Sequence, residues 1–498
     1  FFKQKTAYEM LRSLVGSEMC IRDRGVAEAQ AMALLGVEPV WNGRGEVVDV
    51  KLIDEKELGR PRVDVILTIS GLYRDGMPEK IDLLDKAVRL AASAPEDNVI
   101  RKNTKAVEAA LLDKGTDPET ARLAAEARVF GPAPGAFGVG MAGVVESSRD
   151  NNDQKLLAEI YLRNMGYAYS RQLRGKLVEG NLGAQLSNNQ VVIHSRSTNL
   201  YGVLDNDDTF QFAGGLHAAT TLASGKPPEF LISNVRKQGQ ERFEKLSAFL
   251  ERELQTRAWN PKWIEGMKAS GYSGARQIAR ELEHLYGMRA TAPEQVDPGV
   301  WQEMLEVYVK DKHRLRLKDF FEKENPYAQQ MLAARLMEID RQGVYKFPEA
   351  DRKLLLSTYI SSIRRHQAAC YVNVCDNAAL TAYVRREARR LAAVGRVELD
   401  QMNRQLTAST GRPALAEGGR KAPPKSRATM LPARPRPLFD RIVPADVARR
   451  ILRHSFDRPI ETGAGAVLLC ILLLGTAHGL ARRRMVHPGL VVLASIRE

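Results

Sequence analysis

Cysteine is scarce in this 498-residue sequence, which contains only Cys20, Cys370, Cys375 and Cys470. Four cysteines in a chain of this length exclude a dense disulfide framework. Cys370 and Cys375, with His366 upstream, also offer too few ligands for a common structural zinc module, so we predict no metal there. No secretory signal is recognisable at the N-terminus. We therefore expect a protein of the reducing cytoplasm.

The central part of the sequence also lacks net charge. The whole chain has a formal charge of +14, but residues 411–498 contribute +10, from 16 basic and 6 acidic residues, and residues 1–24 contribute +2. Only +2 is left for residues 25–410. Because nucleic-acid-binding domains are usually strongly basic, we predict that the folded part has no nucleic-acid partner.

A phosphate-binding loop is missing as well. Residues 131–141, GPAPGAFGVGM, are rich in glycine, but they lack the Gly-Lys-Ser/Thr ending of a Walker A motif. No strand with the spacing of a dinucleotide-binding fold precedes them. We therefore expect no nucleotide site in this loop. Its glycines could allow the backbone to approach a ligand or to pack tightly, or they could serve ordinary turns.

Strand and helix patterns alternate in the first half of the sequence. Residues 62–69, RVDVILTI, are rich in β-branched residues, as in a buried parallel strand. Apolar spacing over residues 81–90 predicts a helix, and residues 229–234 predict another strand. From residue 238 onward the periodicity is helical. The sequence predicts an α/β fold with parallel strand–helix layers, followed by a mostly helical region.

Acidic and histidine side chains concentrate in one stretch, residues 191–218. An apolar run at 191–193 has the pattern of a strand end, His194 follows in a predicted loop, and three aspartates precede a helix that carries His217. The aspartates are Asp205, Asp207 and Asp208. They could simply cap the helix, because aspartate accepts the free N–H groups of a first turn. Alternatively, the acids and histidines could bind a divalent metal or accept protons.

Arginines and tryptophans could hold an acidic, apolar ligand. Arg74 lies in the turn after a predicted strand, at the edge where open α/β sheets bind ligands. Its guanidinium group could form two hydrogen bonds to a ligand carboxylate, as could that of Arg60 or Arg62. Pairing with nearby acids such as Asp75 is the alternative. Trp263 could form a wall for a flat ring or could plug a helix corner.

Longer segments carry a family resemblance. They are LLGVEPVW, ELGRPRVDVILTISGLYRD, LDNDDTFQFAGGL, NPKWIEGMKASGYSGARQIA and GMRATA. In content and order they resemble the large subunit of the CobN and magnesium-chelatase family, and most of all its cobalt branch. The resemblance covers about residues 25–390 and corresponds to the C-terminal part of a much longer subunit. We therefore expect this chain to be a fragment.

The resemblance implies insertion of Co²⁺ into hydrogenobyrinic acid a,c-diamide, a corrinoid tetrapyrrole, in cobalamin biosynthesis. It also implies AAA+ ATPase partner subunits that hydrolyse ATP with Mg²⁺, which agrees with the missing Walker A motif. In this interpretation the catalytic residues are Asp205, Asp207, Asp208 and His194, and the metal ligands are His194, Asp205, Asp207 and His217. The tetrapyrrole contacts are Arg60, Arg62, Arg74, Tyr201 and Trp263.

One position departs from the family pattern, because a histidine is expected near the place of Tyr201. This departure leaves the metal and the activity open. A magnesium-chelatase large subunit acting on protoporphyrin IX is one alternative. A non-catalytic, membrane-tethered carrier of a tetrapyrrole or metal is the other.

Both ends of the sequence differ from its body. Residues 1–24 resemble a translated sequencing adapter, and we exclude them from the fold. The composition of residues 411–460 predicts a basic, disordered linker. An uncharged run within residues 461–484 is long enough to cross a bilayer and predicts an anchor in the inner membrane, before a tail at 485–498. The body is divided into an α/β region, residues 25–235, and a helical region, residues 236–410.

Overall fold

The computed structural model describes residues 12–16, 25–148, 154–199, 201–237, 239–368, 374 and 377–410. These residues belong to one compact unit. The predicted basic linker, membrane anchor and tail lie outside the described residues. No helix in the described ranges is long and apolar enough to cross a membrane.

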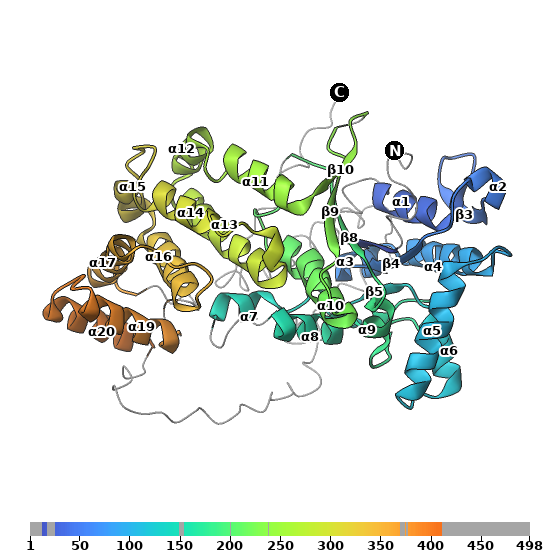
Figure 1. The fold of residues 1–498 in the computed structure, drawn as a ribbon. Coiled ribbons are helices and arrows are strands. Elements are labelled where there is room, and N and C mark those ends of the chain that lie inside the picture. Colours follow the sequence, from blue (N-terminus) through green and yellow to red (C-terminus); the bar gives the residue numbers. More distant parts are fainter. Residues whose placement is uncertain are drawn as a thin grey trace, which may run out of the picture. The chain divides into compact units, whose positions relative to one another are not determined.

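An eight-stranded sheet forms the first half of the structure (Figure 1). Its strand order is β10-β9-β8-β1-β4-β5-β6-β7. The strands are β1 Arg12–Gly16, β4 Asp64–Thr68, β5 Val129–Gly131, β6 Tyr167–Ala168, β7 Lys176–Leu177, β8 Val191–Arg196, β9 Glu229–Asn234 and β10 Arg242–Lys245. The strands from β9 to β5 pair in parallel, while β10, β6 and β7 are antiparallel. A separate hairpin joins β2 Val37–Trp41 to β3 Val47–Leu52.

Strand β4 is buried on both faces, as its sequence predicts. Val65 and Leu67 belong to a core that also contains residues of α1, Val26–Leu35, and α4, Pro78–Ser93. Ile66, which points to the other face, belongs to a second core that extends through the helical region. The predicted combination of parallel strand–helix layers with a later helical region is therefore confirmed.

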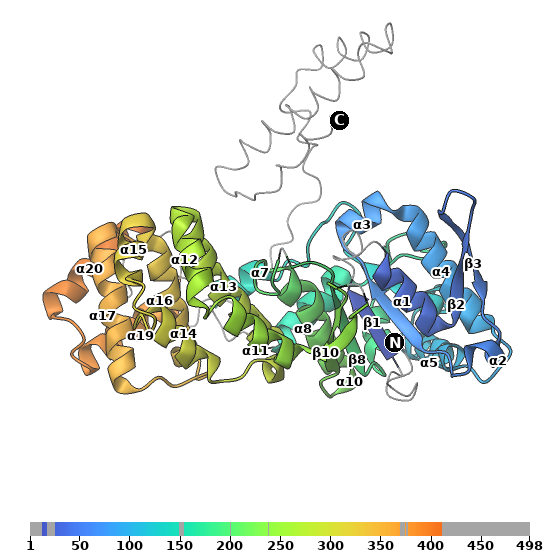
Figure 2. The ribbon, with the colours of Figure 1, turned by 90° about the horizontal axis from the view of Figure 1, so that it is seen from above.

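Helices make up most of the remaining structure. The short ones are α2 Glu55–Leu58, α3 Gly71–Gly76, α7 Ala142–Ser147, α9 Asn181–Leu186, the π-helix η3 Thr209–Gly214 and the 3-10 helix η4 Pro293–Gln295. The longer ones are α5 Val99–Asp113, α6 Pro118–Glu126, α8 Gln154–Met165, α10 Gly215–Ser224, α11 Leu246–Thr256, α12 Pro261–Ala269, α13 Gly271–Thr291, α14 Val300–Tyr308, α15 Leu317–Glu324, α16 Pro326–Arg341, α17 Glu349–His366, α19 Ala378–Arg390 and α20 Arg396–Thr410. The largely buried α13 contacts α12, α15 and α16 as well as η3, α7 and α8, and so joins the helical region to the sheet (Figure 2).

Strand β1 corrects the exclusion of residues 1–24 from the fold. Its backbone lies between β4 and β8, with Arg12 in register with Asp64 and Ser13 with Val191. A central strand of a parallel sheet satisfies backbone N–H and C=O groups on both neighbours, and this pairing does not require a particular sequence. The exclusion is therefore wrong for Arg12–Gly16. The adapter origin of the segment stays a prediction.

The sheet also continues past the predicted boundary at residue 235. Strand β10 pairs antiparallel with β9, with Lys245 opposite Leu231, so helices follow only from Leu246. Three of the four residues of β10 are charged, and the segment therefore lacks the apolar pattern by which a strand is recognised.

The π-helix η3 and α13 approach closely at Gly287. A Cβ atom on Gly287 would lie 2.7 Å from the ring of Phe210, which is itself buried. We predict that Gly287→Ala lowers the free energy of unfolding by about 1–3 kcal/mol, because the added methyl group overpacks this contact. This loss outweighs the gain of about 1 kcal/mol that alanine offers over glycine within a helix.

Gly266→Ala in α12 is the matched control. No atom lies within 4 Å of a Cβ atom on Gly266, so this variant should be as stable as the wild type or more stable by up to about 1 kcal/mol. Urea unfolding followed by circular dichroism measures both changes. Wild-type stability of Gly287→Ala would contradict the close contact.

Candidate active site

The acidic loop follows the carboxyl end of β8, the edge where α/β sheets bind ligands. Arg196 is the last residue of the strand, and η3 begins at Thr209. His194 lies within β8, opposite Ile232 of β9, and not in a loop as predicted. Ile193 before it and Ile232 opposite it are apolar, and β8 continues through the polar residues Ser195 and Arg196, which pair with β9.

Asp205 forms an ion pair with Arg257. One guanidinium nitrogen, Nη2, lies 2.6 Å from both carboxylate oxygens of Asp205. The N–H of Gly202 donates to Oδ2 of the same carboxylate at 2.6 Å. The Arg257 guanidinium also lies over the ring of Trp263, 5.9 Å from its centroid. The carboxylate is therefore held by its own loop and by the residue that follows α11.

Glu281 of α13 places a second carboxyl group beside Asp205. Its side chain is buried. Burial, together with the charge of Asp205 and a hydrogen bond to it, raises the pKa of Glu281 well above its ordinary value of 4.5. These surroundings therefore favour the neutral, protonated form of Glu281 over its carboxylate. Its Oε1 atom has no hydrogen-bond partner among the described residues.

Glu253 and two arginines surround this carboxyl pair. Glu253 Oε2 accepts the N–H of Val203 at 2.7 Å. Its Oε1 lies 3.9 Å from a guanidinium nitrogen of Arg196 and 3.9 Å from one of Arg236. Burial raises the pKa of Glu253 and lowers that of Arg196. Three acids and three arginines thus form one network, which we call the acidic network: Asp205, Glu253, Glu281, Arg196, Arg236 and Arg257.

Asp207 and Asp208 have local partners instead. The Asp207 carboxylate accepts the side-chain amide of Gln211 at 2.9 Å. Gln211 in turn accepts the N–H groups of Met141 and Ala142, which ties the glycine-rich loop to this turn. Asp208 occupies the N-cap position of η3, but its carboxylate accepts from Asn206 and makes no capping bond. Both aspartates therefore shape the turn.

The three histidines near the loop are buried. Burial and the nearby charge of Arg196 lower the pKa of His194 to about 3, and its Nδ1 atom has no hydrogen-bond partner among the described residues. Burial lowers the pKa of His284, whose Nδ1 lies 2.6 Å from the carbonyl of Leu204, to about 4. His194 and His284 are therefore neutral at pH 7. His217 stacks on a phenylalanine ring, and its Nε2 lies 2.7 Å from Oε1 of Glu294.

The predicted metal ligands do not assemble into one centre. In the ranges that the structure describes, no group of three or more His, Cys, Asp or Glu side chains is arranged to hold a metal ion. Asp205 is paired with Arg257, Asp207 with Gln211, and His217 with Glu294. The predicted set of His194, Asp205, Asp207 and His217 is therefore not a metal site in this conformation.

The three predicted carboxylate-binding arginines bind the protein itself. Arg74 pairs with Asp75 and donates to two carbonyls of the glycine-rich loop at 2.7 and 2.9 Å. Arg62 pairs with Glu96 and donates to the carbonyl of residue 53. Arg60 donates to carbonyls at the end of α1. In this conformation their donors are occupied, and the structure favours the alternative that they stabilise the fold.

Tyr201 and Trp263 are the remaining predicted ring contacts. Tyr201 is 39% exposed beside the loop. Trp263 packs, partly buried, against the core and below the Arg257 guanidinium. Trp263 therefore supports the ion pair of Asp205, while a ring contact by Tyr201 stays a prediction.

Comparisons with known proteins agree on one family. The model of the CobN/Magnesium Chelatase family matches residues 10–352. The aerobic cobaltochelatase subunit CobN of Pseudomonas aeruginosa is 35% identical over 339 residues, which are 67% of this chain and 27% of that protein. A magnesium-chelatase subunit of Rhodobacter capsulatus is 34% identical over 325 residues, which are 64% of this chain and 26% of that protein.

A solved structure shares the fold. The catalytic subunit of cobaltochelatase from Mycobacterium tuberculosis aligns with a TM-score of 0.66 at 30% sequence identity. The alignment covers 71% of this chain and 30% of that one. The chain therefore spans less than a third of the length of the relatives that it matches.

The buried proton of Glu281 predicts a pH effect on stability. The folded state holds this proton at pH values where the unfolded chain has lost it, so wild-type stability falls as the pH rises above about 4.5. The unfolding free energy lost is about 1.4 kcal/mol for each pKa unit by which folding raises the pKa of Glu281. Glu281→Gln imitates the protonated group, so its unfolding free energy should depend less on pH and should equal or exceed that of the wild type at pH 8.

Urea unfolding between about pH 5 and pH 8 measures this difference. Glu265→Gln, at an exposed position of α12, is the control and should follow the wild type. Parallel pH profiles for wild type and Glu281→Gln would show that Glu281 carries no proton in the fold.

Proposed function

This chain belongs to the CobN and magnesium chelatase family, and from that membership we propose that it is the C-terminal part of the large, tetrapyrrole-binding subunit of an ATP-dependent cobaltochelatase. The proposed reaction is insertion of Co²⁺ into hydrogenobyrinic acid a,c-diamide in the cytoplasm, as a step of cobalamin biosynthesis. The observation that carries this proposal is the family match over residues 10–352. The solved cobaltochelatase subunit, which shares the fold, supports it.

Insertion of Mg²⁺ into protoporphyrin IX is an equally supported second function. The identity to the magnesium-chelatase relative, 34%, is close to the 35% found for the cobaltochelatase relative. The choice between the two depends on the ring and the ion that the complete subunit accepts.

We propose that separate AAA+ subunits hydrolyse ATP, with Mg²⁺, to drive the insertion. The glycine-rich loop supports this division of labour, because it lacks a Walker A ending. In the structure this loop donates N–H groups to Gln211 and accepts from Arg74, so it serves the fold.

The chemistry requires proton acceptors. A divalent ion replaces two pyrrole N–H protons, so the site must take up protons while the ion sheds water. Asp205 and the protonated Glu281 form a carboxyl pair, and such a pair can gain or release one proton without creating an isolated buried charge. We therefore assign proton transfer to Asp205 and Glu281. Asp207 and Asp208 shape the loop, and His194, with a pKa of about 3, is a poor acceptor at neutral pH.

Replacement of Asp205 tests this assignment in the complete subunit with its AAA+ partners. Asp205→Asn keeps the shape of the side chain but removes its basic oxygen. Turnover should fall by about 10² to 10⁴, the contribution of a positioned acid–base group. Absorbance of the ring during insertion measures turnover with Co²⁺ and the corrinoid and with Mg²⁺ and protoporphyrin IX. The pair that reacts identifies the branch of the family.

Asp117→Asn is the matched control. The Asp117 carboxylate accepts the N–H of Thr120 at 2.9 Å and caps α6, and asparagine caps a helix about equally well. Turnover should therefore be unchanged, and thermal unfolding should show that both variants remain folded. Full turnover of folded Asp205→Asn would reject Asp205 as the acceptor. Failure of the wild-type complex with both rings would favour a carrier without catalytic activity.

A further inference from the structure

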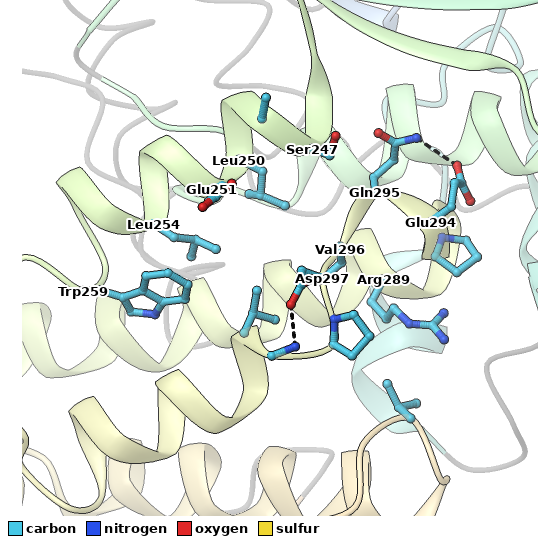
Figure 3. Close-up of a pocket in the computed structure, with 16 residues that line it drawn as sticks. Ser247, Leu250, Glu251, Leu254, Trp259, Arg289, Glu294, Gln295, Val296 and Asp297 are labelled. Atoms are coloured by element: carbon cyan, nitrogen blue, oxygen red, sulfur yellow. Dashed lines mark hydrogen bonds between the residues drawn. The ribbon is translucent and has the colours of Figure 1, made fainter.

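A pocket of about 780 Å³ lies between α11 and the segment that links α13 to α14 (Figure 3). This volume lies within the range of about 300–1,000 Å³ that small-molecule sites occupy. Leu250 and Leu254 of α11 and Val296 and Val300 of the linking segment and α14 give it apolar walls. None of these residues belongs to the acidic network.

The two ends of the pocket differ in character. Figure 3 shows the indole ring of Trp259 at one end and Arg289 at the other. Among the described residues that line the pocket, Arg289 is the one cation, while Glu251, Glu294 and Asp297 are acids. It is partly buried, and burial lowers its pKa. No hydrogen bond or ion pair joins its guanidinium group to another of the described residues.

The three acids that line the pocket have other hydrogen-bond or ion-pair partners, although the charge of Glu294 also acts on Arg289. Glu251 accepts from the side chain of Gln255 at 3.3 Å. Glu294 lies 2.7 Å from His217 and accepts from Gln295 at 3.1 Å. Asp297 accepts the N–H of Gly299 at 2.7 Å. The pocket therefore offers a donor without a hydrogen-bond partner at one end and an aromatic face at the other, with apolar walls between them and three acids that bind other groups. A partly desolvated guanidinium in this setting favours an acceptor with negative charge.

We propose that this pocket binds the tetrapyrrole, with the flat ring between Trp259 and the apolar walls and a peripheral carboxylate on Arg289. The identity of the ring rests on the proposed function. The assignment of the pocket rests on its volume, its apolar walls and the unpaired Arg289. It also gives the carboxylate-binding role, first predicted for Arg60, Arg62 and Arg74, to an arginine whose donors are unoccupied.

Helix α11 connects this pocket to the acidic network. Leu250 and Leu254 face the pocket, while Glu253 binds the acidic loop through the N–H of Val203. Arg257, which follows the helix, pairs with Asp205. A ring that shifts α11 on binding would therefore act on the carboxyl pair through the same helix.

Two variants of this chain test the pocket. Arg289→Gln removes the cation, and Ala248→Trp fills the pocket from an exposed position of α11 without entering the core. Equilibrium dialysis with metal-free protoporphyrin IX and with hydrogenobyrinic acid a,c-diamide measures binding. Arg289→Gln should raise the dissociation constant of the ring that the wild type binds by about tenfold or more, because a charge-assisted hydrogen bond is lost. Ala248→Trp should raise it by at least as much, because the indole occupies the space of the ring.

Each variant has a matched control outside the pocket. Arg276→Gln removes a partly buried arginine of the same helix, α13, and Gln255→Trp adds an indole to an exposed position of α11. Both should bind like the wild type. The dimethyl ester of protoporphyrin IX is a further probe: Arg289→Gln should no longer weaken binding when the ring lacks free carboxylates.

The outcomes separate the pocket from the proposed function. If the wild type binds a ring and Arg289→Gln and Ala248→Trp bind it equally well, the pocket assignment is wrong and the family function stands. If the wild type binds neither ring, the pocket assignment is contradicted, while turnover of the complete subunit with its partners still decides the proposed function. Thermal unfolding of each variant shows whether weaker binding results from loss of the fold. If Arg289→Gln is unstable, Ala248→Trp still tests the pocket, because its indole is added at the surface.

Discussion

Two carboxyl groups on one buried helix constrain the arrangement of the whole structure. Glu281 and Glu283 of α13 are both buried, and a buried carboxylate is costly unless it is paired or protonated. Glu283 is paired with Arg335 of α16, whose guanidinium also lies 4.1 Å from the ring centroid of Tyr286. For Glu281, burial and the charge of Asp205 instead raise the pKa and so favour the protonated form. The contact of Glu283 with Arg335 therefore fixes α13 against the helical region. The contact of Glu281 with Asp205 fixes it against the loop after β8.

The same arrangement places a proton-handling group and an apolar pocket on either side of α11. The helix presents Glu253 to the acidic loop and Leu254, the next residue, to the pocket. Metal insertion needs both a place for a flat, acidic ring and acceptors for its protons. The two proposals assign these tasks to neighbouring parts of one structural unit, which α11 connects.

Local sequence patterns predicted the elements whose burial is set by their own residues. Strand β4 was predicted from its β-branched run, β9 from residues 229–234, and α4 from its apolar spacing. Elements that depend on distant partners were missed. Strand β10 is charged and is a strand only because β9 pairs with it, and β1 is held by backbone pairing on both sides.

The sequence predicted the loop of the candidate site but not the distant residues that bind it. The acidic loop was recognised because its aspartates are close together in the sequence. The partners that define their chemistry are far away in the sequence: Arg257 follows Asp205 by 52 residues, and Glu281 lies on another helix. An acid within the apolar pattern of Ile278, Leu282 and Leu285 was the one local sign of Glu281. Arg289 gave no local sign, because an unpaired arginine is recognised only when its surroundings are known.

The central claim is that the acidic network holds a proton on Glu281 at neutral pH. Infrared spectroscopy of the folded chain measures this directly, because a protonated carboxyl group and a carboxylate absorb at different frequencies. The difference spectrum between wild type and Glu281→Gln at pH 7 should contain the carbonyl band of a protonated carboxyl group. A difference spectrum that contains carboxylate bands instead would show that Glu281 is ionised, and would contradict the account.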